Sequence, residues 1–311
     1  MADAVADVRV SAVGRRPGRR ALMRKKSIIA FLFALPLILI VACLVIYPAL
    51  YAVSLAMMNK SMQYYNIFSA KNNFAFLFSR NTFWMVVEQS VLFAVTAVVF
   101  KAIIGFIVAH FVHNIPQKGQ RKWRGMLLIP WVIPPAMSTL AWLWLFDPSY
   151  SAFNWIFAEI GLPAVPWTGN PYWARFCVIL VNVWVGSPFF MIMYLAALKS
   201  VPEQLHEAAA IDGANWLQKI WYVNLPMMRN IIQITALFSL IVTFANFDIV
   251  RILTAGGPID KTHVFATWSF RVGIEGGDIP LGATVSLFMV PILTIAAIFI
   301  LRDITRRGNE A

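Results

Sequence analysis

The sequence carries little charge, and acidic residues are its scarcest charged type. Only 13% of the 311 residues are charged, whereas about a quarter is usual for a soluble domain. Asp and Glu together number 14 against 26 Lys and Arg, and 60% of the residues are hydrophobic. Because so few charges cannot keep that much apolar surface in water, the composition predicts a protein that lipid covers over much of its surface.

Cysteine and histidine are also scarce. The two cysteines, Cys43 and Cys177, both fall inside apolar runs, so we expect no disulfide between them. Among the four histidines, only His110 and His113 lie close together in the sequence. We interpret this pair as interfacial side chains at a membrane edge, and the sequence predicts no metal site.

The sequence also lacks Gly-Lys-Ser and Gly-Lys-Thr, the core of the loop that cradles nucleotide phosphates. We therefore do not expect the chain to hydrolyse ATP itself. No pairing of a nucleophile with a base stands out either. An enzyme that works within the membrane stays open as a class, but no motif supports it.

Apolar runs of about 20 or more residues dominate the sequence, and each is long enough to cross a bilayer as a helix. They predict an all-α membrane protein with six transmembrane helices, over residues 27–52, 84–112, 125–146, 172–198, 230–250 and 281–301. The first run is too long for a cleaved signal peptide. Residues 1–26 are predicted to be a disordered basic tail, and residues 302–311 a second tail.

Lys and Arg are distributed unevenly between the two ends of these runs. With the N-terminus in the cytoplasm, 18 of them fall in segments predicted to be cytoplasmic and 6 in segments predicted to be external. Because positive residues favour the cytoplasmic side, both termini and the polar segment 199–229 are predicted to be cytoplasmic. The net charge of +12 is then a topology signal, and nucleic-acid binding gains no support from it.

The polar segment 199–229 has the local signals of two short helices. Pro202 suits a first helical position with Ser200 as its cap. Gly213 suits the left-handed residue that ends a helix. The segment between them, with its run of alanines, is strongly helix-forming.

The second short helix is expected to start at Asn215, a capping residue, and to end or kink at Pro226. It carries Trp216, Ile220 and Trp221, which are expected on one helical face. Such a face could pack against a partner or against the protein's own helices, and the sequence leaves both open.

The spacing in this segment resembles the EAA loop of the membrane permease subunits of binding-protein-dependent ABC importers. Glu207-Ala208-Ala209 is followed after three residues by Gly213, after nine more by Val223, and then by Leu225-Pro226. The family pattern has Ile where this chain has Val223. The resemblance implies coupling helices that dock on an ATP-binding subunit, carried here by Glu207, Ala208, Ala209, Asp212, Gly213, Leu225 and Pro226.

Other stretches are similar to the carbohydrate branch of this family, of the maltose and glycerol-phosphate type. They are residues 129–135 with their prolines, 182–189 (NVWVGSPF) and 254–258 (TAGGP). The resemblance covers about residues 27–301 and implies the type I importer permease fold. By the same resemblance, two helices line the solute site, with Asn182, Gly186, Phe189, Ser239, Thr243 and Asn246.

The resemblance implies a non-catalytic transport subunit of the bacterial cytoplasmic membrane that passes a sugar, polyol or glycoside. The expected partners are a second homologous permease, a solute-binding protein and two ATP-binding subunits that hold ATP and Mg, with no cofactor in this chain itself. The alternatives are another small polar solute such as a glycerol-phosphate compound, or a secondary transporter. The latter class usually shows internal repeats of spans, and none is evident.

Three further features allow two interpretations each. Lys101, within the second span, is expected to pair inside the bundle or to extend to the interface, with a substrate role as the alternative. Asp248 suits a gate or loop contact as well as solute binding. The tryptophans are interpreted as an interfacial belt rather than a sugar platform, and they are Trp142, Trp144 and Trp155.

Overall fold

The computed structural model describes residues 19–59, 67–68 and 70–308. The chain divides into two units, residues 1–51 and 52–311, which are described separately. Residues 1–18 of the predicted N-terminal tail and residues 309–311 of the predicted C-terminal tail lie outside the described residues.

The described residues of the first unit, 19–51, form one helical run that continues to Ala56 of the second unit. Helix α1 (Arg19–Val41) continues through a π-helical turn, η1 (Ala42–Ile46), into α2 (Tyr47–Ala56). The prediction of disorder was wrong for residues 19–26, because their Arg, Leu, Met and Lys residues are good helix formers that continue the apolar helix toward the N-terminus. Exposed apolar side chains such as Phe33 and Leu44 surround the helix, as a lipid-facing span requires.

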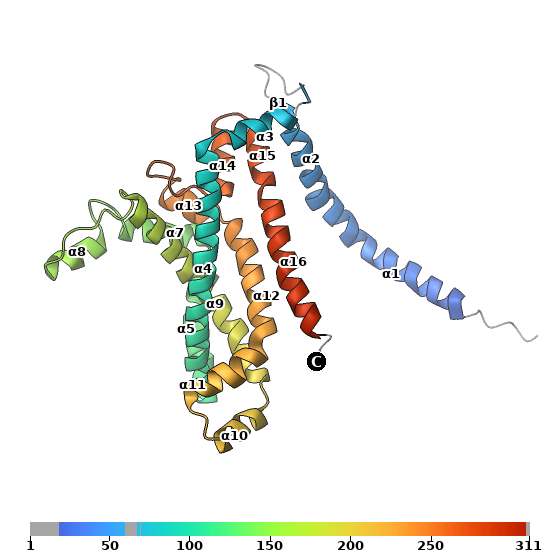
Figure 1. The fold of residues 1–311 in the computed structure, drawn as a ribbon, viewed down its shortest axis with the longest axis vertical. Helices are drawn as coiled ribbons and strands as arrows, with labels where there is room; N and C mark the ends of the chain where they lie inside the picture. The colour runs from blue at the N-terminus through green and yellow to red at the C-terminus, as the bar shows by residue number, and fades with distance from the viewer. Residues whose placement is uncertain (1–18, 60–66, 69, 309–311) are drawn as a thin grey trace, which may run out of the picture. The chain divides into compact units, whose positions relative to one another are not determined.

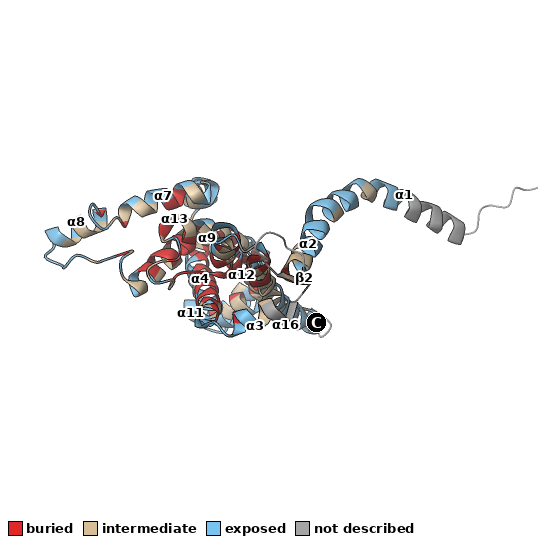
Figure 2. Ribbon diagram, turned by 90° about the horizontal axis from the view of Figure 1, so that it is seen from above, coloured by how far each residue is buried: buried red, intermediate tan, exposed pale blue. Residues whose placement is uncertain are grey.

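The second unit is built on long helices that are visible side by side in Figure 1. Helix α4 (Asn81–Asn114) packs against α9 (Pro171–Ser200) and α12 (Leu225–Phe244). Helix α15 (Ile279–Leu287) leads into α16 (Met289–Gly308), which packs along α12. Figure 2 shows the buried residues gathered on α4, α9 and α12. Because α16 runs to Gly308, residues 302–308 are helical rather than a loose tail.

Five helical stretches among the described residues are long and apolar enough to cross a membrane. They are Ile29–Ala56, Asn81–Asn114, Pro171–Ser200, Trp216–Phe244 and Ile279–Arg306. The fold is therefore all-α, as the sequence predicts, and the described residues contain five such stretches where the sequence predicts six spans. The described strands are two-residue pieces, β1 (Met58–Asn59) and β2 (Ile67–Phe68), which pair antiparallel with Met58 opposite Phe68.

The third predicted span is not one helix. The basic stretch before it is helical, α5 (Gln117–Leu127), and is followed by α6 (Ile129–Val132) and α7 (Pro135–Leu145). Ile133, before the proline pair, is extended with φ −69° and ψ 132°, as a residue ahead of proline prefers. The prolines thus divide the apolar run 125–146 into shorter pieces.

Short helices connect the long ones. They are α3 (Ala70–Phe78) ahead of α4, α8 (Ala152–Glu159) after α7, and α13 (Asp248–Leu253) with α14 (Phe265–Phe270) after α12. A π-helical turn, η3 (Arg271–Glu275), follows α14 and packs against α15.

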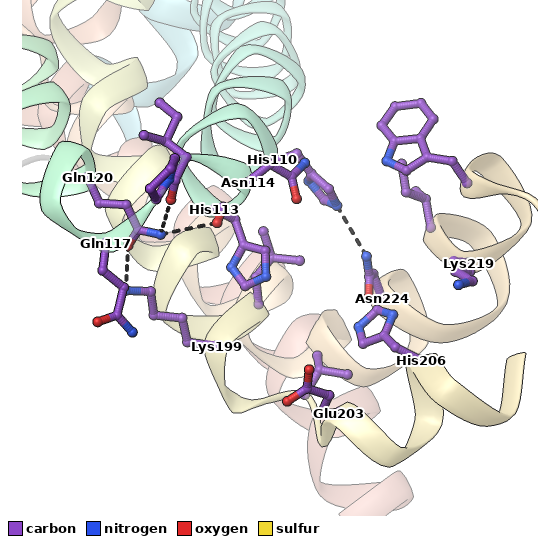
Figure 3. A pocket seen from close by; sticks show the side chains of 16 residues that line it. His110, His113, Asn114, Gln117, Gln120, Lys199, Glu203, His206, Lys219 and Asn224 are labelled. Atoms are coloured by element: carbon purple, nitrogen blue, oxygen red, sulfur yellow. Dashed lines mark hydrogen bonds between the residues drawn. The ribbon is translucent and has the colours of Figure 1, made fainter. Parts of the chain in front are cut away.

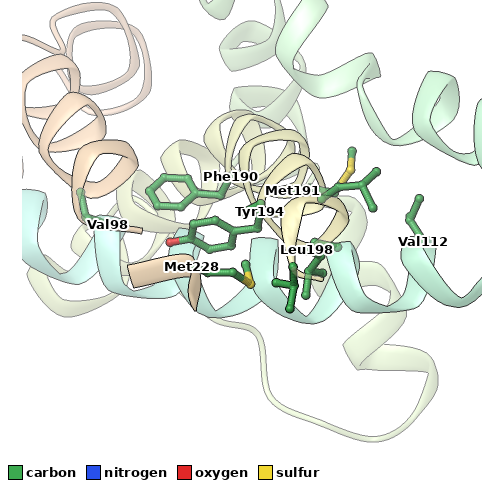
Figure 4. Packing of buried hydrophobic residues seen from close by; sticks show 11 residues of the cluster. Val98, Val112, Phe190, Met191, Tyr194, Leu198 and Met228 are labelled. Atoms are coloured by element: carbon green, nitrogen blue, oxygen red, sulfur yellow. The ribbon is translucent and has the colours of Figure 1, made fainter. Parts of the chain in front are cut away.

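The contact between α4 and α9 depends on a glycine. A Cβ added at Gly105 would lie 2.3 Å from the Phe190 Cβ and 3.0 Å from the Met191 backbone N. Small residues at such positions let two membrane helices approach closely. Beside this crossing, the rings of Phe190 and Tyr194 pack edge to face at 5.6 Å, within the buried cluster of Figure 4.

Candidate functional site

The EAA loop, residues 199–229, begins at the end of α9. Its first helix, α10 (Glu203–Ile211), starts one residue later than expected, with Pro202 as the N-cap. The Ser200 hydroxyl donates to the Ala197 carbonyl at 2.7 Å. Ser200 thus satisfies the end of α9 and does not cap α10, so the predicted cap was wrong, since its side chain turns back to a carbonyl that the ending helix leaves free.

Gly213 ends α10 as predicted. Its φ is +77°, in the left-handed region that favours glycine. The Ala214 N–H donates to the Ala209 carbonyl at 2.8 Å, and the Gly213 N–H donates to the Ala210 carbonyl at 3.1 Å. This pair of bonds is the Schellman helix ending, so the turn between the two helices is set by its own backbone bonds.

The second helix of the loop, α11 (Trp216–Lys219), starts at the predicted cap. Asn215 Oδ1 accepts from the Gln218 N–H at 2.9 Å, and Gln218 Oε1 accepts from the Asn215 N–H at 2.7 Å. These two reciprocal bonds form a capping box.

The helix then continues without a break through Pro226, where an end or kink was expected. A π-helical turn, η2 (Ile220–Asn224), joins α11 to α12, and the Leu225 N–H bonds to the Ile220 carbonyl in the wider i→i+5 pattern. The widened turn lies just ahead of the proline ring and accommodates it. The second half of the loop and α12 therefore form one helical stretch, Trp216–Phe244.

The predicted coupling residues lie largely on the surface. Glu207, Ala208, Asp212, Gly213 and Pro226 are exposed, while Ala209 and Leu225 are half-buried. The expected single face of Trp216, Ile220 and Trp221 was wrong. Ile220 is buried, whereas Trp216 and Trp221 are 61% and 66% exposed, because the turn that begins at Ile220 is π-helical and changes the direction in which its side chains point.

A cavity of about 860 Å³ lies between this loop and the adjoining ends of α4, α5 and α9 (Figure 3). His110, His113 and His206 line it, together with Lys199 and Lys219. No group of three or more His, Cys, Asp or Glu side chains that could hold a metal ion occurs among the described residues.

One hydrogen bond across this cavity joins the loop to α4. The His110 Nδ1 lies 3.1 Å from the Phe106 carbonyl, which can only accept, so this nitrogen carries the proton. Its Nε2 then accepts from Asn224 Nδ2 at 3.2 Å. Both His110 and Asn224 are buried, and the bond connects the π-helical turn to α4.

A second set of bonds holds the neighbouring helix ends. The Gln120 side chain donates to the carbonyls of His113 and Ile115, at 3.1 and 2.8 Å. Lys199 Nζ in turn donates to Gln120 Oε1 at 2.9 Å. One glutamine thus ties together the ends of α4 and α9 and the start of α5.

Five of the six predicted solute residues, all but Asn246, fall on two helices that pack together, α9 and α12. Asn182 and Ser239 are buried, at 5% and 6% exposure, and Thr243 is buried at 1%. Gly186 and Phe189 are half-buried. The Phe189 ring lies 5.2 Å from the Phe238 ring, which brings an aromatic pair to the same part of the bundle.

Asn246 and Asp248 lie beyond the end of α12. Asn246 is half-buried in the turn after the helix, and its Oδ1 has no partner among the described residues. Asp248 is exposed at the first position of α13. Ser239 and Thr243 thus share a continuous helix, whereas Asn246 belongs to a separate turn.

Lys101 is the additional member of this set. Its Nζ donates to Thr243 Oγ1 at 2.9 Å, which confirms the expected pairing within the bundle. Its side chain also passes over Gly186, where an added Cβ would lie 2.6 Å from the Lys101 Cε. Lysine in the middle of an apolar run was the sequence signal for this position, but its partners were not apparent from the sequence.

The interfacial interpretation of the tryptophans is wrong for Trp142. Its ring packs against those of Phe146 and Trp184, at 5.4 and 5.6 Å. Trp144 and Trp155 are 81% and 67% exposed. The first of the three therefore contributes to the core, because helix α7 turns it toward α9.

The TAGGP stretch is held by hydroxyl and backbone bonds. Thr254 Oγ1 and Thr262 Oγ1 are 2.8 Å apart, and the Gly257 N–H donates to the Thr254 carbonyl at 2.8 Å. Gly256 has φ +89°, and an added Cβ would lie 2.1 Å from the His263 Cε1. Only glycine fits both the backbone conformation and the close approach of this ring.

His263 is buried against this stretch as a neutral ring. Arg271 Nη1 can only donate, so the His263 Nε2, 3.0 Å away, accepts, and Nδ1 carries the proton toward Thr267 Oγ1 at 3.1 Å. Burial lowers the pKa of His263 to about 4, and the charge of Arg271 acts in the same direction.

The fold and these features define a multi-pass helical membrane protein whose surface loop of two short helices is continuous with a membrane-spanning helix. Residues 101–307 match the family described as the binding-protein-dependent transport system inner membrane component. The chain belongs to this family, and it is an ABC transporter permease.

Two curated relatives illustrate the family. The trehalose/maltose transport system permease protein MalF of Thermococcus litoralis is 28% identical over 282 residues, covering 90% of this chain and 95% of the relative. The probable ABC transporter permease protein y4oQ of Sinorhizobium fredii is 32% identical over 231 residues, covering 74% of each.

A solved structure shares the fold. It is that of a bacterial alginate ABC transporter in complex with an alginate pentasaccharide-bound periplasmic protein, with a TM-score of 0.78 at 21% identity over 90% of this chain and 94% of that chain. The predicted type I importer permease fold is thereby confirmed.

Proposed function

We propose that this chain is the permease subunit of an importer that passes a sugar, polyol or glycoside, delivered by a solute-binding protein and driven by ATP. The name of one relative, the trehalose/maltose permease MalF, supports a saccharide. The observation that carries the proposal is the unbroken helical stretch Trp216–Phe244, which joins the exposed EAA loop to buried Ser239 and Thr243.

The EAA loop is the proposed contact with the motor. Two ATP-binding subunits hold ATP and Mg, and the exposed Glu207 and Asp212 face one of them. Because α11 and α12 are continuous, a displacement of the loop moves the helix that bears Ser239 and Thr243. The stretch Trp216–Phe244 has 29 residues, so it is about 40 Å long, and it transmits the displacement over that distance.

The solute path is proposed to run along α9 and α12, shared with a second, homologous permease. Amide and hydroxyl groups at Asn182, Ser239 and Thr243 suit the hydroxyls of a saccharide. The Phe189 ring suits the apolar face of a sugar ring. Gly186 leaves room between the helices for the Lys101 side chain, and Asn246 lies at the outer end of the path.

The proposed setting is the bacterial cytoplasmic membrane, with both termini and the EAA loop in the cytoplasm. The excess of Lys and Arg in the segments assigned to that side supports this orientation. Single cysteines placed at exposed loop positions test it. A membrane-impermeant thiol reagent added outside intact cells should leave residues 202–226 unlabelled, and labelling there would reverse the orientation.

The function is tested by reconstituting the complete importer in proteoliposomes with its binding protein. We expect saccharide uptake that needs ATP inside and the binding protein outside. Uptake driven by an ion gradient without nucleotide would make the protein a secondary transporter. A thermal-shift screen of the binding protein against saccharides and glycerol-phosphate compounds identifies the solute and shows which of these two classes it belongs to.

A further inference from the structure

Lys101 is a buried positive charge within a membrane span. It lies on α4, twenty residues after Asn81 and thirteen before Asn114, and only 4% of the residue is exposed. A cation so placed is costly, so membrane proteins pair it or use it. The ion pairs among the described residues do not include Lys101.

The helices around Lys101 carry no carboxylate that could pair with it. Neither α9 (Pro171–Ser200) nor α12 (Leu225–Phe244) contains Asp or Glu. On α4 itself the acidic residue is Glu88, thirteen positions away, which corresponds to about 20 Å along a helix. The negative charge that balances Lys101 is therefore not supplied by the helices that surround it.

The Lys101 ammonium lies among the proposed solute residues. Its Nζ is 2.9 Å from Thr243 Oγ1, and a Cβ at Gly186 would lie 3.1 Å from it. An ammonium has three N–H donors, and Thr243 accepts one of them. The Thr243 hydroxyl is itself occupied as a donor, to the Ser239 carbonyl at 2.6 Å.

An unpaired acceptor lies one helical turn from this point. Asn182 precedes Gly186 by four residues on α9, so both lie on the same helical face. Asn182 is 5% exposed, and its Oδ1 has no partner among the described residues. Since buried polar groups are normally hydrogen-bonded, spare donors on Lys101 and a spare acceptor on Asn182 indicate a ligand that offers both kinds of group.

We propose that the transported solute is an anionic saccharide, whose carboxylate or phosphate pairs with Lys101 while a hydroxyl donates to Asn182 Oδ1. This proposal rests on the proposed function and narrows it from saccharides in general to sugar acids or sugar phosphates. The oxyanion supplies the charge that α9 and α12 lack and that Glu88 of α4 is too far away to provide. The saccharide hydroxyls supply the donors.

The first test uses the wild-type importer in proteoliposomes with its binding protein. Three probes are compared for ATP-driven uptake: a neutral disaccharide, a uronic-acid oligosaccharide and a sugar phosphate. We expect uptake of one of the two anionic probes and not of the neutral one, and the two anionic arms separate a carboxylate from a phosphate. ATP-driven uptake of the neutral saccharide alone would overturn the inference and leave the proposed function standing. Absence of ATP-driven uptake of any saccharide would overturn both.

The second test removes the charge. Lys101→Met should raise the KM for the anionic probe on the order of tenfold to a hundredfold, the range of a charge-assisted hydrogen bond. Lys101→Arg keeps the charge and should recover part of the affinity that Lys101→Met loses. If Lys101 served only to pack, its charge would not matter and no such recovery would be expected. Lys118→Met removes an exposed charge on α5 and should leave the KM unchanged. An unchanged KM in Lys101→Met would count against the pairing. If that variant does not assemble, the wild-type probes decide alone.

Discussion

Lys101 Nζ donates a hydrogen bond of 2.9 Å to Thr243 Oγ1 across 142 residues of sequence. The bond joins α4 to the helix that continues into the EAA loop, and both residues are buried. Near its C-terminal end, helix α12 is thus bonded to Lys101 through Thr243. The π-helical turn before its N-terminal end is bonded to α4 through Asn224 and His110. A movement of α12 relative to α4 must therefore break both hydrogen bonds and replace them with others.

Removing the acceptor at Thr243 should destabilise the protein. Thr243→Val keeps the shape of the side chain but leaves the Lys101 ammonium without its protein partner. The expected cost is about 1–3 kcal/mol, that of a buried polar group left unsatisfied. It is measured as a lower thermal unfolding midpoint of the purified protein in detergent. Thr243→Ser keeps the hydroxyl, and its unfolding midpoint should fall less. Equal midpoints for the wild type and Thr243→Val would show that the bond does not contribute to stability.

Adding a methyl group at Gly105 should disrupt the contact between α4 and α9. Its Cβ would lie 2.3 Å from the Phe190 Cβ and 3.0 Å from a backbone nitrogen. Overpacking of this kind costs about 1–3 kcal/mol, more than the gain of about 0.5–1 kcal/mol for alanine over glycine in a helix. We therefore expect a lower unfolding midpoint for Gly105→Ala.

Gly125 provides the matched control for this change. It lies in α5, and an added Cβ meets nothing within 4 Å. Gly125→Ala should therefore be neutral or slightly stabilising, through helix propensity alone. If both variants lowered the midpoint equally, the close approach at Gly105 would not be what holds the two helices.

Local chemistry explains which parts of this structure the sequence could predict. The left-handed end at Gly213 and the cap at Asn215 follow from residue type and spacing, because their bonds stay within one turn. Of the spans, the unbroken apolar runs were recognised as helices for the same reason. The prolines of the third run were visible, but how they divide it depends on neighbours that the sequence does not identify.

The misassigned parts depend on contacts or on unusual turns. Pro226 signals a helix end, yet a π-helical turn at Ile220–Asn224 accommodates it and keeps the helix continuous. The partner of Lys101 lies 142 residues away, and that of His110 lies 114 residues away. No periodic pattern encodes such a pairing, so the bonds that fix α12 were beyond prediction from the sequence.

His263 should make stability depend on pH. Burial lowers its pKa to about 4, against about 6.5 in an unfolded chain. Among the charges that act on it, Arg271 and Arg251 lower the pKa, while Asp260 and Glu275 raise it. Between these two values the unfolded chain binds the proton and the folded one does not. The contribution of the neutral His263 ring to the free energy of unfolding is therefore fully present above about pH 6.5 and is lost as the pH falls toward 4.

The change to measure is the difference in unfolding free energy between wild type and His263→Gln. Glutamine does not titrate, so pH effects of other groups are common to both proteins and cancel. The unfolding free energy of the wild type, minus that of His263→Gln, should fall by on the order of 3 kcal/mol between pH 7 and pH 4. A difference that stayed constant over this range would mean that His263 is not held neutral by the fold.

Gly213 should be essential to the link between ATP hydrolysis and transport. In Gly213→Val a β-branched residue must adopt φ near +77°, which costs at least about 1–2 kcal/mol and favours a different chain direction. The two helices of the EAA loop would then meet at another angle, although an added Cβ meets nothing within 4 Å. We expect the variant to reach the membrane and to assemble, but to lose solute uptake and the ATPase stimulation caused by the loaded binding protein.

Gly161 separates this effect from backbone strain in general. It also has a left-handed φ, +75°, and an added Cβ there meets nothing within 4 Å. It lies after α8 (Ala152–Glu159), outside the EAA loop, so Gly161→Val imposes a similar strain without changing that loop. Its uptake and stimulated ATPase should remain near wild type. If Gly213→Val also kept both activities, the turn at Gly213 would not transmit the motion, because the altered angle would have had no consequence for transport.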